Sequence, residues 1–83
     1  MKFIPCRRVP APDLSEDDVS RLYDRRLVES PVPLSEGDCF CLIHHGSILP
    51  VFCSSSSGRC ILRRMSPEEI QYSEENGGDT PWS

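Results

Sequence analysis

The chain has 83 residues, a formal net charge of −4 and a pI of about 5.0. This length allows one small domain, and a domain of this size buries only about 60% of the surface that its unfolded chain exposes. Because nucleic acids attract basic surfaces, the acidic balance makes a nucleic-acid partner unlikely for the chain as a whole.

The sequence lacks the patterns of a membrane or secreted protein. No apolar run approaches the roughly 20 residues of a membrane span, and residues 1–12 contain no apolar stretch of the kind found in signal peptides. We therefore expect a cytoplasmic protein without a membrane partner. Five cysteines in a reducing compartment, an odd number, favour free thiols over a disulfide framework.

The N-terminal third predicts a short strand and one main helix. Residues 2–9 can form a strand that Pro5 confines to a sheet edge, and residues 10–14 form a proline-rich linker. Ser15 is a helix N-cap followed by three acids that suit the positive end of a helix dipole. Apolar residues at helical spacing then predict a helix over residues 16–28, followed by a loop over residues 30–38.

Residues 39–53 predict a β-hairpin that is apolar on both faces. Gly46 and Ser47 between two apolar runs indicate a two-residue type II′ turn, with residue pairs 45/48, 44/49, 42/51 and 40/53. One face then carries residues 40, 42, 44, 49, 51 and 53, and the other carries residues 39, 41, 43, 45, 48, 50 and 52. A strand pair that is apolar on both faces requires cover on both faces.

The C-terminal third predicts one more strand, a short helix and a tail. Residues 59–65 read as a third strand after a serine-rich loop, and Ser66, Pro67 and Glu69 form a helix start with a capping box. The helix is predicted over residues 67–73. We thus expect an α+β fold, a three- to four-stranded antiparallel meander packed against one main helix with a short C-terminal helix, in a single domain 1–73 with a disordered tail 74–83.

The cysteines and arginines allow an alternative function. Zinc requires about four thiolate or imidazole ligands, for which the candidates are Cys39, Cys41, Cys53 and Cys60. The Cys-x-Cys spacing on a strand separates two thiols by about 6.6–6.8 Å along the backbone, so we expect buried structural thiols and no metal or other cofactor. The alternative is a small zinc-binding domain that contacts nucleic acid through the arginine pairs at residues 7–8, 25–26 and 63–64.

We do not expect an enzyme. A catalytic thiol needs a base within hydrogen-bond reach and a cleft, whereas Cys41 and His45 are four residues apart on one strand face. The predicted function is instead a non-enzymatic protein–protein interaction module or homodimer, in particular a phage- or plasmid-encoded inhibitor of a host protein complex. The expected contact residues lie on the hairpin face opposite the main helix and among the arginines: Ile43, Ile48, Pro50, Phe52, Arg25 and Arg63.

Overall fold

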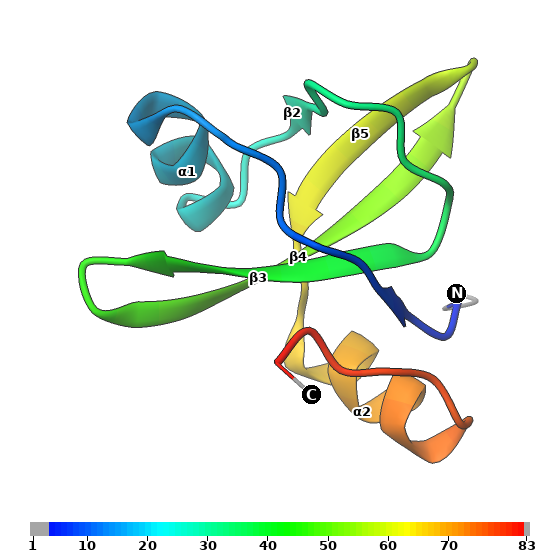
Figure 1. The fold of residues 1–83 in the computed structure, drawn as a ribbon. Coiled ribbons are helices and arrows are strands. Elements are labelled where there is room, and N and C mark those ends of the chain that lie inside the picture. Colours follow the sequence, from blue (N-terminus) through cyan, green and yellow to red (C-terminus); the bar gives the residue numbers. More distant parts are fainter. Residues whose placement is uncertain (1–3, 83) are drawn as a thin grey trace.

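The computed structural model describes residues 4–82 and shows a small α+β fold with a five-stranded mixed sheet and two helices (Figure 1). In chain order the elements are β1 (Arg7–Arg8), α1 (Glu16–Tyr23), β2 (Val28–Glu29), β3 (Asp38–His44), β4 (Ser47–Ser56), β5 (Arg59–Arg64) and α2 (Pro67–Glu75). The strand order is β1-β3-β4-β5-β2. The predicted meander forms the centre of this sheet, and two short edge strands, β1 parallel and β2 antiparallel, extend it.

The helix α1 begins where the sequence predicts and ends earlier than expected. Ser15 accepts a hydrogen bond from the Asp18 N–H at 3.2 Å, so the N-cap is confirmed. Arg25 then adopts a left-handed conformation, φ 64°, and the Arg25 and Arg26 N–H groups return to the carbonyls of Leu22 and Arg21. This Schellman closure ends the helix without a glycine. Residues 24–28, predicted as helix, therefore leave α1, and Val28 pairs with Leu62 of β5.

The hairpin turn lies one residue earlier than predicted. His45 and Gly46 both have positive φ, 49° and 77°, which makes a type I′ turn. His44 pairs with Ser47 and Leu42 with Leu49. The sum of paired residue numbers is two lower than predicted, so the paired strand residues remain on their predicted faces. His45, predicted as a strand residue on the face of Ile43, lies in the turn instead.

Both faces of the hairpin are covered near its base. On the α1 side, Leu22 packs against the buried residues Phe40, Leu49, Val51 and Leu62. On the α2 side, Ile70 packs against a second buried cluster that contains Cys6, Cys39, Phe52 and Met65. Figure 1 shows the two helices on opposite sides of the β3–β4 hairpin. The two-sided apolar pattern of residues 39–53 thus corresponds to a sheet packed on both sides.

Within the predicted tail 74–83, residues 74–75 complete α2 and residues 76–82 fold back onto the N-terminal strand, while residue 83 lies outside the described residues. The Ser73 hydroxyl is fully buried; it accepts from the Cys6 N–H at 2.9 Å and donates to the Asp79 carbonyl at 2.7 Å. Asp79 in turn bonds to Cys6 and Arg8, and Pro81 is buried. A side chain at Gly78 would collide with Ser73 and Cys6. Glycine at this position therefore allows the segment to approach the N-terminal strand.

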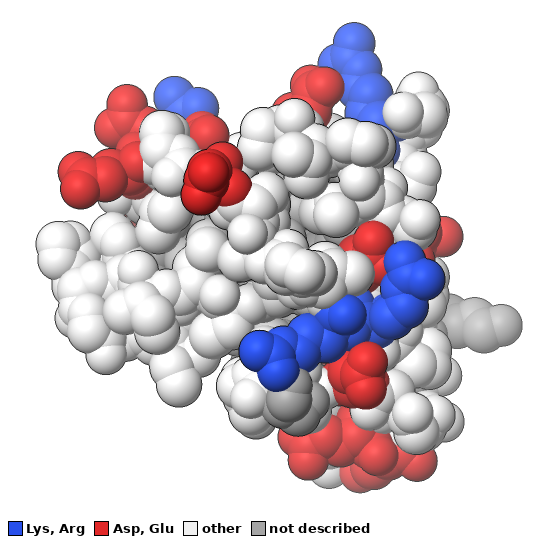
Figure 2. Space-filling model, viewed as in Figure 1, with Lys and Arg blue, Asp and Glu red and all other residues white. Residues whose placement is uncertain are grey.

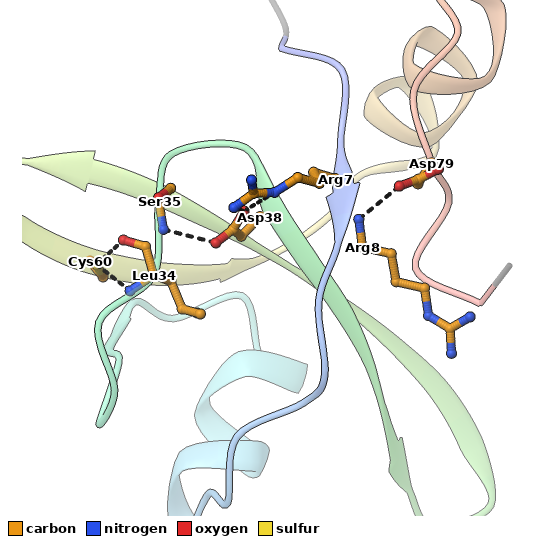
Figure 3. A network of polar contacts seen from close by, with 7 residues as sticks. All are labelled: Arg7, Arg8, Leu34, Ser35, Asp38, Cys60 and Asp79. Atoms are coloured by element: carbon orange, nitrogen blue, oxygen red, sulfur yellow. Dashed lines mark hydrogen bonds and ion pairs between the residues drawn. The ribbon is translucent and has the colours of Figure 1, made fainter.

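Asp38 joins β1 to β3 (Figure 3). Its carboxylate is almost fully buried and accepts from the Arg7 guanidinium at 2.9 and 3.1 Å and from the Ser35 N–H at 2.8 Å. The side chain of Arg7 remains 68% exposed. Water therefore screens the ion pair, and the short bond from the Ser35 backbone to the buried carboxylate contributes more of the stability.

This difference in burial gives a prediction for two substitutions. Asp38→Ala should reduce the free energy of unfolding by about 2 kcal/mol because the Ser35 N–H and the Arg7 guanidinium both lose a charged acceptor. Arg7→Ala should reduce it by no more than about 1 kcal/mol, since an exposed partner contributes little. Urea unfolding of both variants provides the measurement. Equal losses would show that the ion pair, and not the Ser35 bond, carries the stability.

A second buried carboxylate anchors α2. Glu69 is 6% exposed, and it accepts two hydrogen bonds from Arg63, at 2.6 and 2.5 Å, and one from the Ser66 N–H at 3.0 Å. The predicted capping box is thereby confirmed. Burial alone would raise the pKa of Glu69, but the bonds from Arg63 and Ser66 outweigh it and lower this pKa below its ordinary value.

The lowered pKa predicts how stability depends on pH. A carboxylate with a depressed pKa in the folded state stabilises the fold above its unfolded pKa, and this contribution disappears as the pH falls through the folded pKa. The free energy of unfolding of the native chain should therefore fall on acidification below about pH 4.5, and Glu69→Gln should flatten this fall. Urea unfolding at a series of pH values tests it. Glu68→Gln, which removes an exposed charge in the same helical turn, is the control, and equal flattening by both substitutions would contradict the role of Arg63.

Candidate functional site

The end of the β3–β4 hairpin, residues 43–48, extends beyond the cover of α2 (Figure 1), while α1 lies against its other face. Ile43 and Ile48 are direct cross-strand neighbours on one face of it, and they are 68% and 54% exposed. In Figure 2 the surface over this end of the molecule is uncharged and lies below the acidic side chains of α1. The hairpin end therefore presents two adjacent β-branched side chains to the solvent.

The other two apolar residues predicted for this surface belong to the core. Phe52 is 3% exposed and packs in the cluster under α2, where the Arg63 guanidinium lies 4.8 Å from its ring centre. Pro50 is also buried. The exposed apolar surface is consequently smaller than the sequence suggested, because α2 and the segment around Cys6 cover the base of the same face.

Pro50 is tolerated in the central strand β4 because its nitrogen does not face β3. Cys41 and Pro50 face each other as a non-hydrogen-bonded pair, so the missing N–H is not needed by β3. On the other side the Pro50 carbonyl accepts from the Met65 N–H at 2.9 Å, just after β5 ends at Arg64. The proline thus marks the point at which the sheet narrows to a two-stranded ribbon.

The outer edge of β3 is covered by β1 over only two residues. Val9 donates to the Cys39 carbonyl at 2.9 Å, and Pro10 and Pro12 then turn the chain away toward α1. In the alternating ladder of an antiparallel pair, Cys41 and Ile43 direct their backbone N–H and C=O groups away from β4. Within residues 4–82, no strand lies beside these two residues on that side.

The face of the hairpin end toward α1 holds both histidines. The ring of His44 lies 4.8 Å from that of Tyr23 and 4.2 Å from that of His45. Glu16, Ser20 and these histidines line one hollow. Among the described residues no hydrogen bond joins a histidine to Glu16 or Ser20, so the group lacks the contacts by which a base activates a nucleophile.

The predicted arginine pairs are distributed over the fold. Arg63 is bonded to Glu69, Arg7 to Asp38, and Arg64 donates to the Tyr23 carbonyl at 2.8 Å while it stacks on the Tyr23 ring. Arg25 is exposed at the left-handed end of α1. These contacts explain Arg7, Arg63 and Arg64 as local supports, and they do not bring the three pairs together into one anion-binding patch.

The four cysteines considered as zinc ligands lie on two faces of the sheet. Cys39 and Cys41 are on the α2 side, whereas Cys53 belongs to the α1-side cluster, against which Cys60 packs. No group of three or more candidate metal ligands occurs in the described part of the chain. The Cys60 thiol donates to the Leu34 carbonyl at 2.6 Å, and its sulfur accepts from the Leu34 N–H at 3.1 Å (Figure 3). Cys60 therefore fastens the loop before β3 to β5.

Burial suppresses the reactivity of two thiols. Desolvation, reinforced by the neighbouring Cys60, raises the pKa of Cys53 to about 12. A hydrogen bond with Cys6, together with burial, raises the pKa of Cys39. Because the thiolate is the reactive form, neither thiol has the character of a nucleophile at neutral pH.

No family model, curated protein or solved structure matches this chain. In the part of the chain that the structure describes, neither helix has the length and apolarity that crossing a membrane requires.

The thiol environments predict an order of alkylation. With iodoacetamide at neutral pH, Cys41, which is partly exposed, should react first, and Cys39 and Cys53 should react only as fast as the fold opens. Mass spectrometry of peptides from native and urea-unfolded protein measures the order. Rapid alkylation of native Cys53 would contradict it and would point to an activated thiol.

Proposed function

We propose that the chain is a non-enzymatic protein–protein interaction module whose contact surface is centred on the end of the β3–β4 hairpin. The observation that carries this proposal is the exposed cross-strand pair Ile43 and Ile48 on a face that α2 leaves open. Side chains of this type are normally buried, and burying two of them against a partner is favourable because apolar surface leaves water.

The charges around the hairpin end support the same proposal. Protein interfaces combine an apolar, uncharged centre with a polar and charged rim. Here the uncharged hairpin end lies beside α1, whose first turn carries Glu16, Asp17 and Asp18. In Figure 2 acidic side chains lie above this end and basic side chains lie toward the middle of the same face. A partner can thus be oriented by charges at two sides of an apolar contact.

In finer terms, we propose that the module acts as an inhibitor in the cytoplasm that occupies a surface of a larger host protein complex, as a phage- or plasmid-encoded protein would. One support is the small size of the chain, and another is the exposed apolar pair at the projecting hairpin end. Among residues 4–82 the side chains do not form a catalytic arrangement. A homodimer formed through Ile43 and Ile48 is the competing use of the same surface.

Substitution of the isoleucine pair tests the contact. Ile43→Thr/Ile48→Thr keeps β-branched side chains in the hairpin but removes apolar surface. The native chain should retain a specific host protein in affinity capture followed by mass spectrometry, and the double variant should lose it. Its melting temperature should change little, because both side chains are exposed.

Leu27 offers a matched control. It is 66% exposed and lies between α1 and β2, away from the hairpin end, so Leu27→Thr should leave the captured protein unchanged. Capture that survives in the double variant would reject the hairpin end as the contact surface. A native chain that sediments as a dimer, together with a monomeric double variant, would assign the surface to a second copy.

A further inference from the structure

We infer that the open edge of β3 binds an extended segment of the partner as an added, antiparallel β-strand. This inference rests on the proposed interaction function and specifies its geometry. The backbone groups of Cys41 and Ile43 point outward from the sheet without a neighbouring strand. An extended peptide backbone satisfies both of them at once, as in other cases of strand addition.

The sequence of this edge contains none of the features that usually block such pairing. Natural sheets protect exposed edges with lysine, proline, inward-pointing charges or bulges. From Cys39 to His44 the strand is Cys-Phe-Cys-Leu-Ile-His, and it pairs with β4 without an interruption. Pro10 and Pro12 stand instead in the segment that leaves the edge, and they prevent the chain itself from continuing β1 along it.

Two hollows border the open edge and can receive side chains. One is lined by Pro10, Cys41 and Pro81, and the other by Val19, Ile43 and His44. The first includes a residue of the C-terminal segment, which runs along the α2 side, and the second includes a residue of α1 (Figure 1). Successive side chains of an added strand alternate between the faces of a sheet, so an apolar strand can place side chains into both hollows.

The positive charge of Arg8, near the N-terminal end of β3, indicates which charge the added strand should carry. Arg8 lines the first hollow, and its guanidinium makes no ion pair within residues 4–82. Figure 3 shows that this side chain extends away from Asp79, whose carboxylate accepts from the Arg8 backbone N–H instead. An acidic side chain in the added strand can therefore pair with Arg8. For an antiparallel strand, the acid belongs at its C-terminal end.

The same charge disfavours a second copy as the occupant. Two β3 edges that pair about a two-fold axis at Leu42 would place His44 of each copy opposite Phe40 of the other. The hairpin end of each copy would then lie toward Arg8. Residues 43–48 contain no carboxylate, so the added strand itself would bring no acid to Arg8, and the acid beside this hairpin end is Glu16 of α1. The structure thus favours a foreign strand with alternating apolar side chains and a C-terminal acid.

The test uses a display library of random seven-residue peptides as the probe. We expect it to enrich peptides with alternating apolar residues and an acid near the C-terminus. Cys41→Pro removes the outward N–H without taking a bond from the β3–β4 ladder, and Cys41→Ser is the matched control that retains it. Binding of the selected peptides should weaken about tenfold in Cys41→Pro and stay unchanged in Cys41→Ser. Arg8→Gln should weaken binding of the acidic peptides.

Hydrogen exchange in the native chain gives a readout that does not depend on how the variants fold. The Cys41 and Ile43 amides should exchange at least about tenfold more slowly with a selected peptide bound. The Leu42 amide, which faces β4, should be protected with or without peptide. No enrichment, equal binding to Cys41→Pro, or unprotected edge amides would overturn strand addition. Failure of strand addition would not by itself reject the proposed function. Loss of partner capture in Ile43→Thr/Ile48→Thr would still support the hairpin end as the contact surface.

Discussion

The fold depends on the buried carboxylate of Asp38. This one side chain closes the turn before β3 through Ser35 and fixes β1 beside β3 through Arg7. Because β1 is only two residues long, it has little pairing of its own to hold it in place. Asp38 therefore decides how far the β3 edge is covered. After Val9, Pro10 and Pro12 direct the chain away from the sheet. β3 therefore has β1 as a neighbour up to Cys39 and has an open edge beyond that residue.

The elements that the sequence predicts well are those determined by neighbouring residues. Ser15 and Ser66 begin helices through bonds to residues three positions later, and period-two alternation assigns the faces of the hairpin even though its turn is displaced. The end of α1 could not be predicted, because Arg25 takes a left-handed conformation that only its surroundings make favourable. The His45 turn is similar, since Gly46 alone is compatible with more than one turn type.

Long-range contacts account for the remaining differences. The parallel pairing of β1 with β3 depends on Asp38, 31 residues away from Arg7, and no local pattern indicates it. The burial of Pro50 and Phe52 depends on how α2 and residues 76–82 fold back onto the sheet. Of the apolar residues predicted for the contact surface, Ile43 and Ile48 are exposed because they lie at the hairpin end. The sequence does not show that β3 has an open edge, although Pro10 and Pro12 already indicate where β1 must stop.

The contacts of Ser73 and Asp79 with residues 6–8 have a kinetic consequence. They join positions 67 to 73 residues apart in the chain, so within residues 4–82 they close the longest loops and bear the largest closure entropy. Cys6 is synthesised long before Ser73. The contacts of residues 6–8 with Ser73 and Asp79 therefore form after α1 and the central hairpin have assembled through more local pairings. During synthesis, nascent chains therefore pass through an interval in which β3 is paired with β4 while the C-terminal segment does not yet hold residues 6–8 beside it.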